Sequence, residues 1–242
     1  MLVLSPVKPP KNQVFSSFFT PVLAISPKAL AKPPQVCYNR GISKERCVLA
    51  VKKDILYKLF SHIPTLETER LILRGMRVSD AEDMFDYARR PSVTQYLPWD
   101  PHADIDETRE YLTYVCQRYR TGDFYDWGVI DKASGRLIGK CGFTSFNCPH
   151  DSAEIGYVIN PTFQGRGLAT EAVRRVLDFG FTELGLHRIE AHFMEGNDVS
   201  LRLMERVGMT LEGYARESMR IKGRYCTVGT CAILRHEHFG KK

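Results

Sequence analysis

A glycine-rich hexapeptide carries the clearest chemical signal in this sequence, and it consists of Gln164, Gly165, Arg166, Gly167, Leu168 and Ala169. It follows an apolar run that ends at residues 159–161 and opens a segment with helical periodicity. A turn between a strand and a helix leaves backbone N–H groups unpaired, and the helix dipole adds positive charge beside them. The hexapeptide therefore predicts a binding turn for the phosphates of an anionic cofactor, which could approach Gly165 and Gly167 without meeting a Cβ.

Polar residues at two further places in the sequence could take part in catalysis or binding. Glu154 precedes the apolar part of a predicted strand and shares a face with Gly156 and Val158. Asn197 and Ser200 are three residues apart at a predicted helix start, so they also share a face. Each has a plain structural alternative. Glu154 could be a solvent-facing charge at a strand end, and one of Asn197, Asp198 or Ser200 could simply cap the helix.

The elements that must position these residues form one domain over residues 65–239. Alternating and apolar runs predict the strands, and spacing of three to four residues predicts the helices. Ser79 is expected to cap the first helix, and Asp104 or Asp106 the second. We expect strands at 70–74, 125–130, 137–146, 152–159, 187–193, 210–219 and 225–234, with further helices at 167–184 and 198–207.

Residues 1–55 differ in composition from this domain. The first fifty residues contain seven of the thirteen prolines, seven Lys or Arg and one acid, while the rest of the chain has 27 basic and 27 acidic side chains. The basic balance therefore belongs to the N-terminal segment and argues against nucleic-acid binding by the domain. We interpret residues 1–55 as a disordered or targeting-like tail. Three origins stay open: a transit peptide, a secretory signal, or upstream sequence that is not made in the cell, with translation beginning near Val51.

The cysteine pattern and the hydropathy bear on the compartment. The seven cysteines are odd in number and include no C-x-x-C pair, and no His–Cys cluster has zinc spacing. We expect reduced thiols in a cytosol-like compartment. The sequence contains no run of 18 consecutive apolar residues, so we expect no membrane span. The expected location is cytoplasmic, or an organelle if the N-terminal segment is a transit peptide.

Together these motifs resemble the GCN5-related N-acetyltransferase (GNAT) superfamily, and most closely its ribosomal-protein N-terminal acetyltransferase branch. The acetyl-CoA motif of that family is Gln/Arg-x-x-Gly-x-Gly/Ala, which Gln164, Gly167 and Ala169 match. Supporting segments lie at 154–159 before it, and at Asn197-x-x-Ser200 and Val207-Gly208-Met209 after it. The family often has Phe where this chain has Met209. The resemblance covers about residues 65–239.

The resemblance implies an α/β (α+β) fold with a mixed, mostly antiparallel central sheet that is splayed around the acyl-CoA site and flanked by helices. Acetyl-CoA would lie between parallel strands 152–159 and 187–193, with its pyrophosphate on residues 164–169. The pantetheine arm would pair with backbone groups of Tyr157, Val158 and Ile159 and with Asn197. No metal is implied.

The implied reaction is direct attack of a primary amine on the thioester. Glu154 would act as the general base, directly or through water. Ser200 would donate a proton or a hydrogen bond to the departing thiolate, with Tyr214 or Tyr225 as alternatives. The expected acceptor is a protein or peptide N-terminal α-amino group, a ribosomal protein included. A small amine (polyamine, amino acid or drug) and a non-catalytic CoA-binding sensor stay open as alternatives. We expect a monomer or homodimer that binds neither nucleic acid nor membranes.

Overall fold

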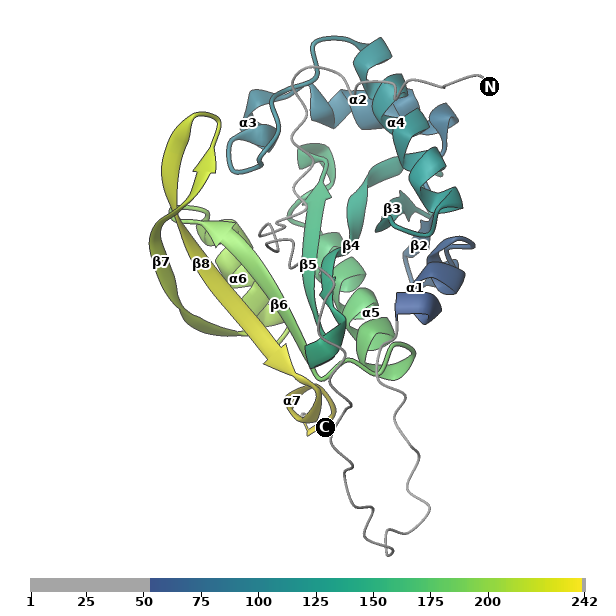
Figure 1. The fold of residues 1–242 in the computed structure, drawn as a ribbon. Helices are drawn as coiled ribbons and strands as arrows, with labels where there is room; N and C mark the ends of the chain where they lie inside the picture. The colour runs from purple at the N-terminus through teal and green to yellow at the C-terminus, as the bar shows by residue number, and fades with distance from the viewer. Residues whose placement is uncertain (1–52, 241–242) are drawn as a thin grey trace, which may run out of the picture.

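The computed structural model describes residues 53–240, and its centre is one mixed sheet (Figure 1). The strand order is β1-β2-β3-β4-β5-β6-β8-β7. All neighbours pair antiparallel except β5 and β6, which are parallel. The strands are β1 (Leu66–Glu67), β2 (Leu71–Arg74), β3 (Tyr125–Asp131), β4 (Leu137–Asn147), β5 (Ser152–Ile159), β6 (Arg188–Met194), β7 (Thr210–Ile221) and β8 (Arg224–Leu234).

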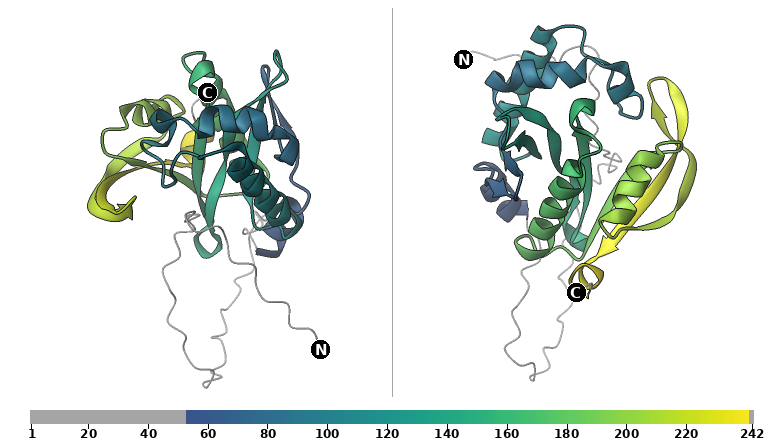
Figure 2. Two further views of the ribbon diagram at one scale, coloured as in Figure 1. Left: turned by 90° about the horizontal axis from the view of Figure 1, so that it is seen from above. Right: turned by 180° about the vertical axis from the view of Figure 1, so that it is seen from behind.

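Helices cover both faces of this sheet. One hydrophobic cluster joins the sheet to α1, α5 and α6, and a second joins the opposite face to α2 and α4. The view from behind shows α5 and α6 on the same side of the strands (Figure 2). The helices are α1 (Lys53–Phe60), α2 (Ala81–Ala88), α3 (Pro91–Thr94), α4 (Ile105–Arg120), α5 (Leu168–Thr182), α6 (Asp198–Arg206) and α7 (Arg235–Gly240), with 3₁₀ turns at Val78–Asp80, Cys148–His150 and Pro161–Phe163.

The two parallel strands part after a short contact. They pair at only three positions, of which the last is Glu154 with Glu190. Beyond that point β5 continues along β4 as far as Ile159, while β6 continues along β8 as far as Met194. The strands therefore diverge and leave an opening between them, which Figure 1 shows widening toward α3. We call it the β5–β6 opening.

The predicted fold class and strand positions are confirmed, with differences at the helix starts. Asp104 caps α4, because its carboxylate accepts a hydrogen bond from the Glu107 amide at 2.9 Å. Ser79 does not cap α2. A 3₁₀ turn comes first, and the Asp80 carboxylate accepts from Arg74 at 2.8 and 2.9 Å. The short α3 and the C-terminal α7 were not expected from the sequence.

The folded part of the chain begins earlier than the predicted boundary at residue 65. Leu56 and Phe60 of α1 are buried in the cluster that includes α5. The predicted tail falls for the most part on residues 1–52, which lie outside the described residues. No helix within residues 53–240 is long and apolar enough to cross a membrane.

Candidate active site

The hexapeptide forms a tight turn between β5 and α5, which we call the phosphate turn (residues 164–169). Gly165 and Gly167 have φ values of 75° and 78°, in the left-handed region that favours glycine. Gly167 is the N-cap of α5, and a Cβ built on Gly165 would meet no atom within 4 Å. In the described chain, the amides of Gly167, Leu168 and Ala169 have no hydrogen-bond acceptor. The turn therefore combines free N–H groups, open space and the positive end of a 15-residue helix.

Side chains from outside and within the turn hold it in place. Gln164 donates from Nε2 to the Ile159 carbonyl at 2.9 Å, which ties the turn to the end of β5. Arg70 donates from Nη1 to the Arg166 carbonyl at 2.9 Å, and its Nη2 lies 2.6 Å from a Glu171 oxygen. Burial raises the pKa of Glu171, but hydrogen bonds from Thr68 and Arg70 outweigh it, so the net pKa is lowered. Glu171 therefore stays ionised and anchors Arg70 against the turn.

The free edge of β5 offers fewer groups than expected. A Cβ built on Gly139 of β4 would come within 2.1 Å of the Val158 carbonyl oxygen. This carbonyl therefore points toward β4. Alternation along the strand then directs the backbone groups of Tyr157 and Ile159 to the β5–β6 opening. The Ile159 carbonyl already accepts one hydrogen bond from Gln164. The predicted pairing through Val158 therefore does not match the register, whereas Tyr157 and Ile159 face the opening.

Glu154 lies where the strands part, on the sheet face opposite α5. Its neighbours Ala153 and Ile155 are buried in the cluster with α5, so Glu154 points the other way. One carboxylate oxygen lies 3.1 Å from Nδ1 of His192, and the other accepts from the Ser145 hydroxyl at 3.4 Å. The His192 contact is a close charge contact and not a linear hydrogen bond. The Glu154 carboxylate beside Nδ1 raises the pKa of His192, against the opposing effect of burial.

Ser200 lies on the α5–α6 side of the sheet. Its Oγ accepts from the Tyr157 hydroxyl and from Asn197 Nδ2, both at 3.1 Å. Asn197 is the N-cap of α6 and accepts from the Ser200 amide at 3.3 Å, so the structural alternative for Asn197 is observed. Burial raises the pKa of Tyr157 to about 12, against the bond to Ser200, so its hydroxyl stays protonated.

Two residues of this arrangement escaped the sequence reasoning. The sequence motifs gave no role to His192, and Tyr157 was considered only for its backbone. The period-two pattern of β6 could have indicated that His192 and Glu154 share a sheet face. The alternative acids Tyr214 and Tyr225 are 46% and 67% exposed on β7 and β8, and the ring of Tyr214 packs on Phe193 instead. No group of three metal-binding side chains occurs among the described residues.

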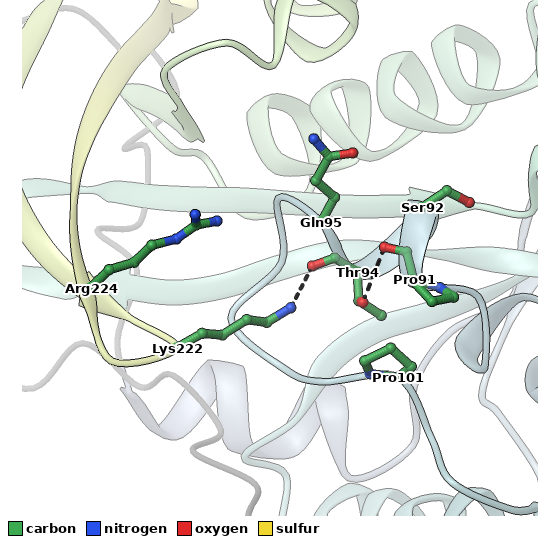
Figure 3. A pocket seen from close by; sticks show the side chains of 7 residues that line it. All are labelled: Pro91, Ser92, Thr94, Gln95, Pro101, Lys222 and Arg224. Atoms are coloured by element: carbon green, nitrogen blue, oxygen red, sulfur yellow. Dashed lines mark hydrogen bonds between the residues drawn. The ribbon is translucent and has the colours of Figure 1, made fainter.

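The wide end of the β5–β6 opening is bridged by α3 and the loop that follows it. Tyr96 donates to the Gly196 carbonyl at 3.1 Å, just before α6. Lys222, at the β7–β8 turn, donates to the Thr94 carbonyl at 2.7 Å and lies 3.7 Å from Asp100. Between α3 and this turn lies a pocket of about 440 Å³ (Figure 3). It is lined by Pro91, Ser92, Thr94, Gln95, Pro101, Lys222 and Arg224.

These features suit an acyl-CoA. The phosphate turn offers free amides to a pyrophosphate, and the unpaired edge of β5 offers Tyr157 and Ile159 to an amide-containing arm. Acetyl-CoA supplies the activated acetyl group in such a site. Glu154 and His192 then lie on one face of the sheet, and Ser200 with Tyr157 on the other, so an amine and a thiol leaving group could be served from opposite sides.

Comparison with known proteins identifies the family. The model of the acetyltransferase (GNAT) domain matches residues 70–210. A curated relative named uncharacterized N-acetyltransferase p20, from Bacillus licheniformis, is 35% identical over 176 residues, which are 73% of this chain and 99% of the relative.

Two solved structures place the fold. Spermidine N-acetyltransferase from Vibrio cholerae, in complex with CoA and spermine, is 29% identical with a TM-score of 0.60, covering 71% of this chain and 99% of its own. Ribosomal-protein-S5-alanine acetyltransferase from Vibrio fischeri has a TM-score of 0.59 over 71% of this chain and 97% of its own, and at 22% identity it supports the fold alone. The superfamily predicted from the motifs is confirmed, and ribosomal-protein acetyltransferases are among its structural neighbours. The chain belongs to the GNAT acetyltransferases and is an acetyl-CoA-dependent N-acetyltransferase.

Proposed function

We propose that the acceptor is the N-terminal α-amino group of a protein or peptide, ribosomal proteins included, and that acidic residues close to that terminus are favoured. The observation that supports this is the charge of the β7–β8 hairpin, which borders the wide end of the β5–β6 opening. Residues 213–226 include one acid, Glu217, and four basic residues, Arg216, Arg220, Lys222 and Arg224.

This charge distribution discriminates between acceptor classes. A polyamine carries a positive charge at each amine, so the hairpin repels it over the Debye length of about 8 Å at physiological salt. A peptide with a carboxylate near its N-terminus is attracted instead. Arg224 has no acidic partner among the described residues, and its guanidinium can bind a carboxylate with two parallel hydrogen bonds. Lys222 is already engaged by Thr94 and Asp100, so Arg224 is the better candidate for such a contact.

The acceptor amine itself also suits this site. An α-amino group has a pKa of about 7.7–8.0, so roughly a third of it is neutral at pH 7.5, compared with about a thousandth of a lysine side chain. An exposed pocket rimmed by a hairpin and a short helix leaves room for the chain that follows the terminal residue.

A polyamine is the second candidate acceptor. The structural neighbour described with CoA and spermine is a spermidine acetyltransferase of 29% identity. In this chain, Glu154, Glu190 and Asp100 are acids that could attract a cationic amine. The charges of Glu190 and Asp100 are offset by Arg188 at 2.9 Å and Lys222 at 3.7 Å, respectively.

The test compares matched acceptors by release of the CoA thiol. Two peptides share a terminal serine and carry either glutamates or lysines at positions two and three, and spermidine is the third acceptor. We expect kcat/KM to fall in the order acidic peptide, basic peptide, spermidine. Arg224→Glu should raise KM for the acidic peptide about tenfold and lower it for the basic one. Arg120→Glu, on the exposed end of α4, makes the same charge change elsewhere. Preferential turnover of spermidine that Arg224→Glu leaves unchanged would contradict the proposal.

A further inference from the structure

We propose that the imidazole of His192, and not the carboxylate of Glu154, takes the proton from the attacking amine, while Glu154 positions the ring. The inference concerns the acetyl transfer itself and does not depend on which amine is the acceptor. It reassigns the general base from the residue that the family resemblance implies to a neighbour on the adjacent strand.

The position of His192 on β6 supports this role. The last β5–β6 pair joins Glu154 to Glu190, and His192 is the next residue of β6 on the same face. It therefore lies about 7 Å along the strand, where β6 has already left β5 and borders the opening. An imidazole there stands at the edge of the space that the thioester would occupy.

The two edges of the imidazole have different surroundings. Nδ1 is buried and lies 3.1 Å from the Glu154 carboxylate. The side chain as a whole is still 25% exposed, so its exposed surface belongs to the opposite edge, which includes Nε2. A carboxylate at Nδ1 keeps the ring proton on that nitrogen and leaves the Nε2 lone pair free to accept a proton.

Glu154 is less available as a base. One of its oxygens meets His192, the other meets the Ser145 hydroxyl, and its side chain is only 13% exposed. A general base is most effective when its pKa lies near the working pH. Contact with Glu154 moves the pKa of His192 upward from 6.5, toward that range.

The charges around His192 account for this direction. Glu154 on β5 and Glu190 on β6 raise the pKa of His192, while burial and Arg188 lower it. Arg188 is itself paired with Glu190 at 2.9 Å and with Glu212 of β7 at 2.6 Å, which reduces its effect. The opposing strand β8 places the uncharged Thr230 beside His192.

The proposed reaction balances in atoms, protons and electrons with an amine and acetyl-CoA as its reactants. The amine nitrogen forms the new bond to the acetyl carbon and gives one proton to Nε2. The carbon–sulfur bond breaks, its electron pair leaves with sulfur, and the sulfur takes one proton from the Ser200 hydroxyl, which regains a proton from water. The products are an amide and the CoA thiol, and the imidazolium then returns its proton to water.

The test is the pH dependence of kcat/KM between pH 5.5 and 9.5, measured with spermidine and with a serine-first peptide. The wild-type rate should rise as His192 loses its proton, with the same low-pH limb for both acceptors. His192→Gln should lower kcat about 10²–10⁴-fold and remove this limb. Glu154→Gln should cost less and move the limb to lower pH, because the group that raises the pKa of His192 is gone. Added imidazole should partly restore His192→Ala.

Two further measurements separate this inference from the acceptor proposal. His187→Gln is the matched control, because His187 is exposed just before β6. NMR titration of the His192 ring nitrogens, in the absence of any acceptor, should show the proton on Nδ1 and a lower pKa in Glu154→Gln. A His192→Gln variant that keeps its rate and its low-pH limb, or a ring with its proton on Nε2, would overturn the inference.

Discussion

The donor and acceptor sides of this site are built in different ways. On the donor side, one continuous segment supplies the phosphate turn and the start of α5, and the binding groups are backbone amides. On the acceptor side, side chains come from β5, β6, α3 and the β7–β8 hairpin, which are up to 133 residues apart in the sequence between Pro91 and Arg224. A backbone site is insensitive to most substitutions. A site made of distant side chains can change its specificity while the sheet stays the same.

The largest effect is expected on the donor side, from Gly167→Glu. This residue has φ 78°, so any side chain adds strain of about 1–2 kcal/mol, and a glutamate adds negative charge where phosphates are proposed to bind. We expect acetyl-CoA affinity to fall at least 100-fold, as measured by calorimetry. Unchanged affinity would remove the phosphate turn from the cofactor site.

A matched control separates charge from backbone strain in this experiment. Gly135, in the turn between β3 and β4, has φ 70° and no atom within 4 Å of a built Cβ. Gly135→Glu should therefore lower the melting temperature about as much as Gly167→Glu and leave acetyl-CoA binding intact. Loss of binding in both variants would show that the effect is on folding.

The next largest effect is expected where the donor meets the acceptor, from Ser200→Ala. Loss of a hydrogen bond to a developing thiolate costs about 1.5–3 kcal/mol, or about 10–100-fold in kcat. Acetyl-CoA affinity should change little. Tyr157→Phe removes the hydroxyl that donates to Ser200 at 3.1 Å, and a double-mutant cycle should show less than additive losses. Additive losses would mean that the two hydroxyls act separately, and an unchanged kcat would exclude Ser200 as the acid.

The same contrast explains what the sequence could predict. The strands and the phosphate turn follow from local patterns: alternation for β5, glycine spacing for the turn, and an apolar stripe for α5. The contact of Glu154 with His192 depends on the register of two parallel strands that pair at only three positions, and no local pattern encodes that register. The pocket between α3 and Lys222 depends on the contact of the β7–β8 turn, at the edge of the sheet, with α3, which is far away in the sequence. Ser79 was expected to cap α2 because serine is a good helix cap. It does not, because a 3₁₀ turn that ends at Asp80 comes before the helix, and Asp80 is paired with Arg74.

The smallest effect tests whether the donor side is truly local, because Arg70, just before β2, contacts the phosphate turn, and Arg70 and Thr68 both contact Glu171 of α5. Glu171 accepts from the Arg70 amide at 2.9 Å and from the Thr68 hydroxyl at 2.6 Å, and Arg70 in turn holds the Arg166 carbonyl. Glu171→Gln keeps the shape but removes the charge. Because Arg70 is 46% exposed, we expect a loss of only about 0.5–1 kcal/mol in stability and a severalfold weaker acetyl-CoA affinity.

The stabilising effect of Glu171 should depend on pH in a definite direction. The pKa of Glu171 is lowered in the folded state from 4.5, so its contribution is present above that value and is lost as the pH falls through the folded pKa. The difference in unfolding free energy between wild type and Glu171→Gln should therefore be constant above pH 5 and shrink at lower pH. Glu183→Gln, at the exposed C-terminal end of α5, is the matched control and should show neither change. If Glu171→Gln binds acetyl-CoA as tightly as wild type, the turn holds its shape through its glycines and Gln164 alone. The donor side then needs no side chain from the segment before β2.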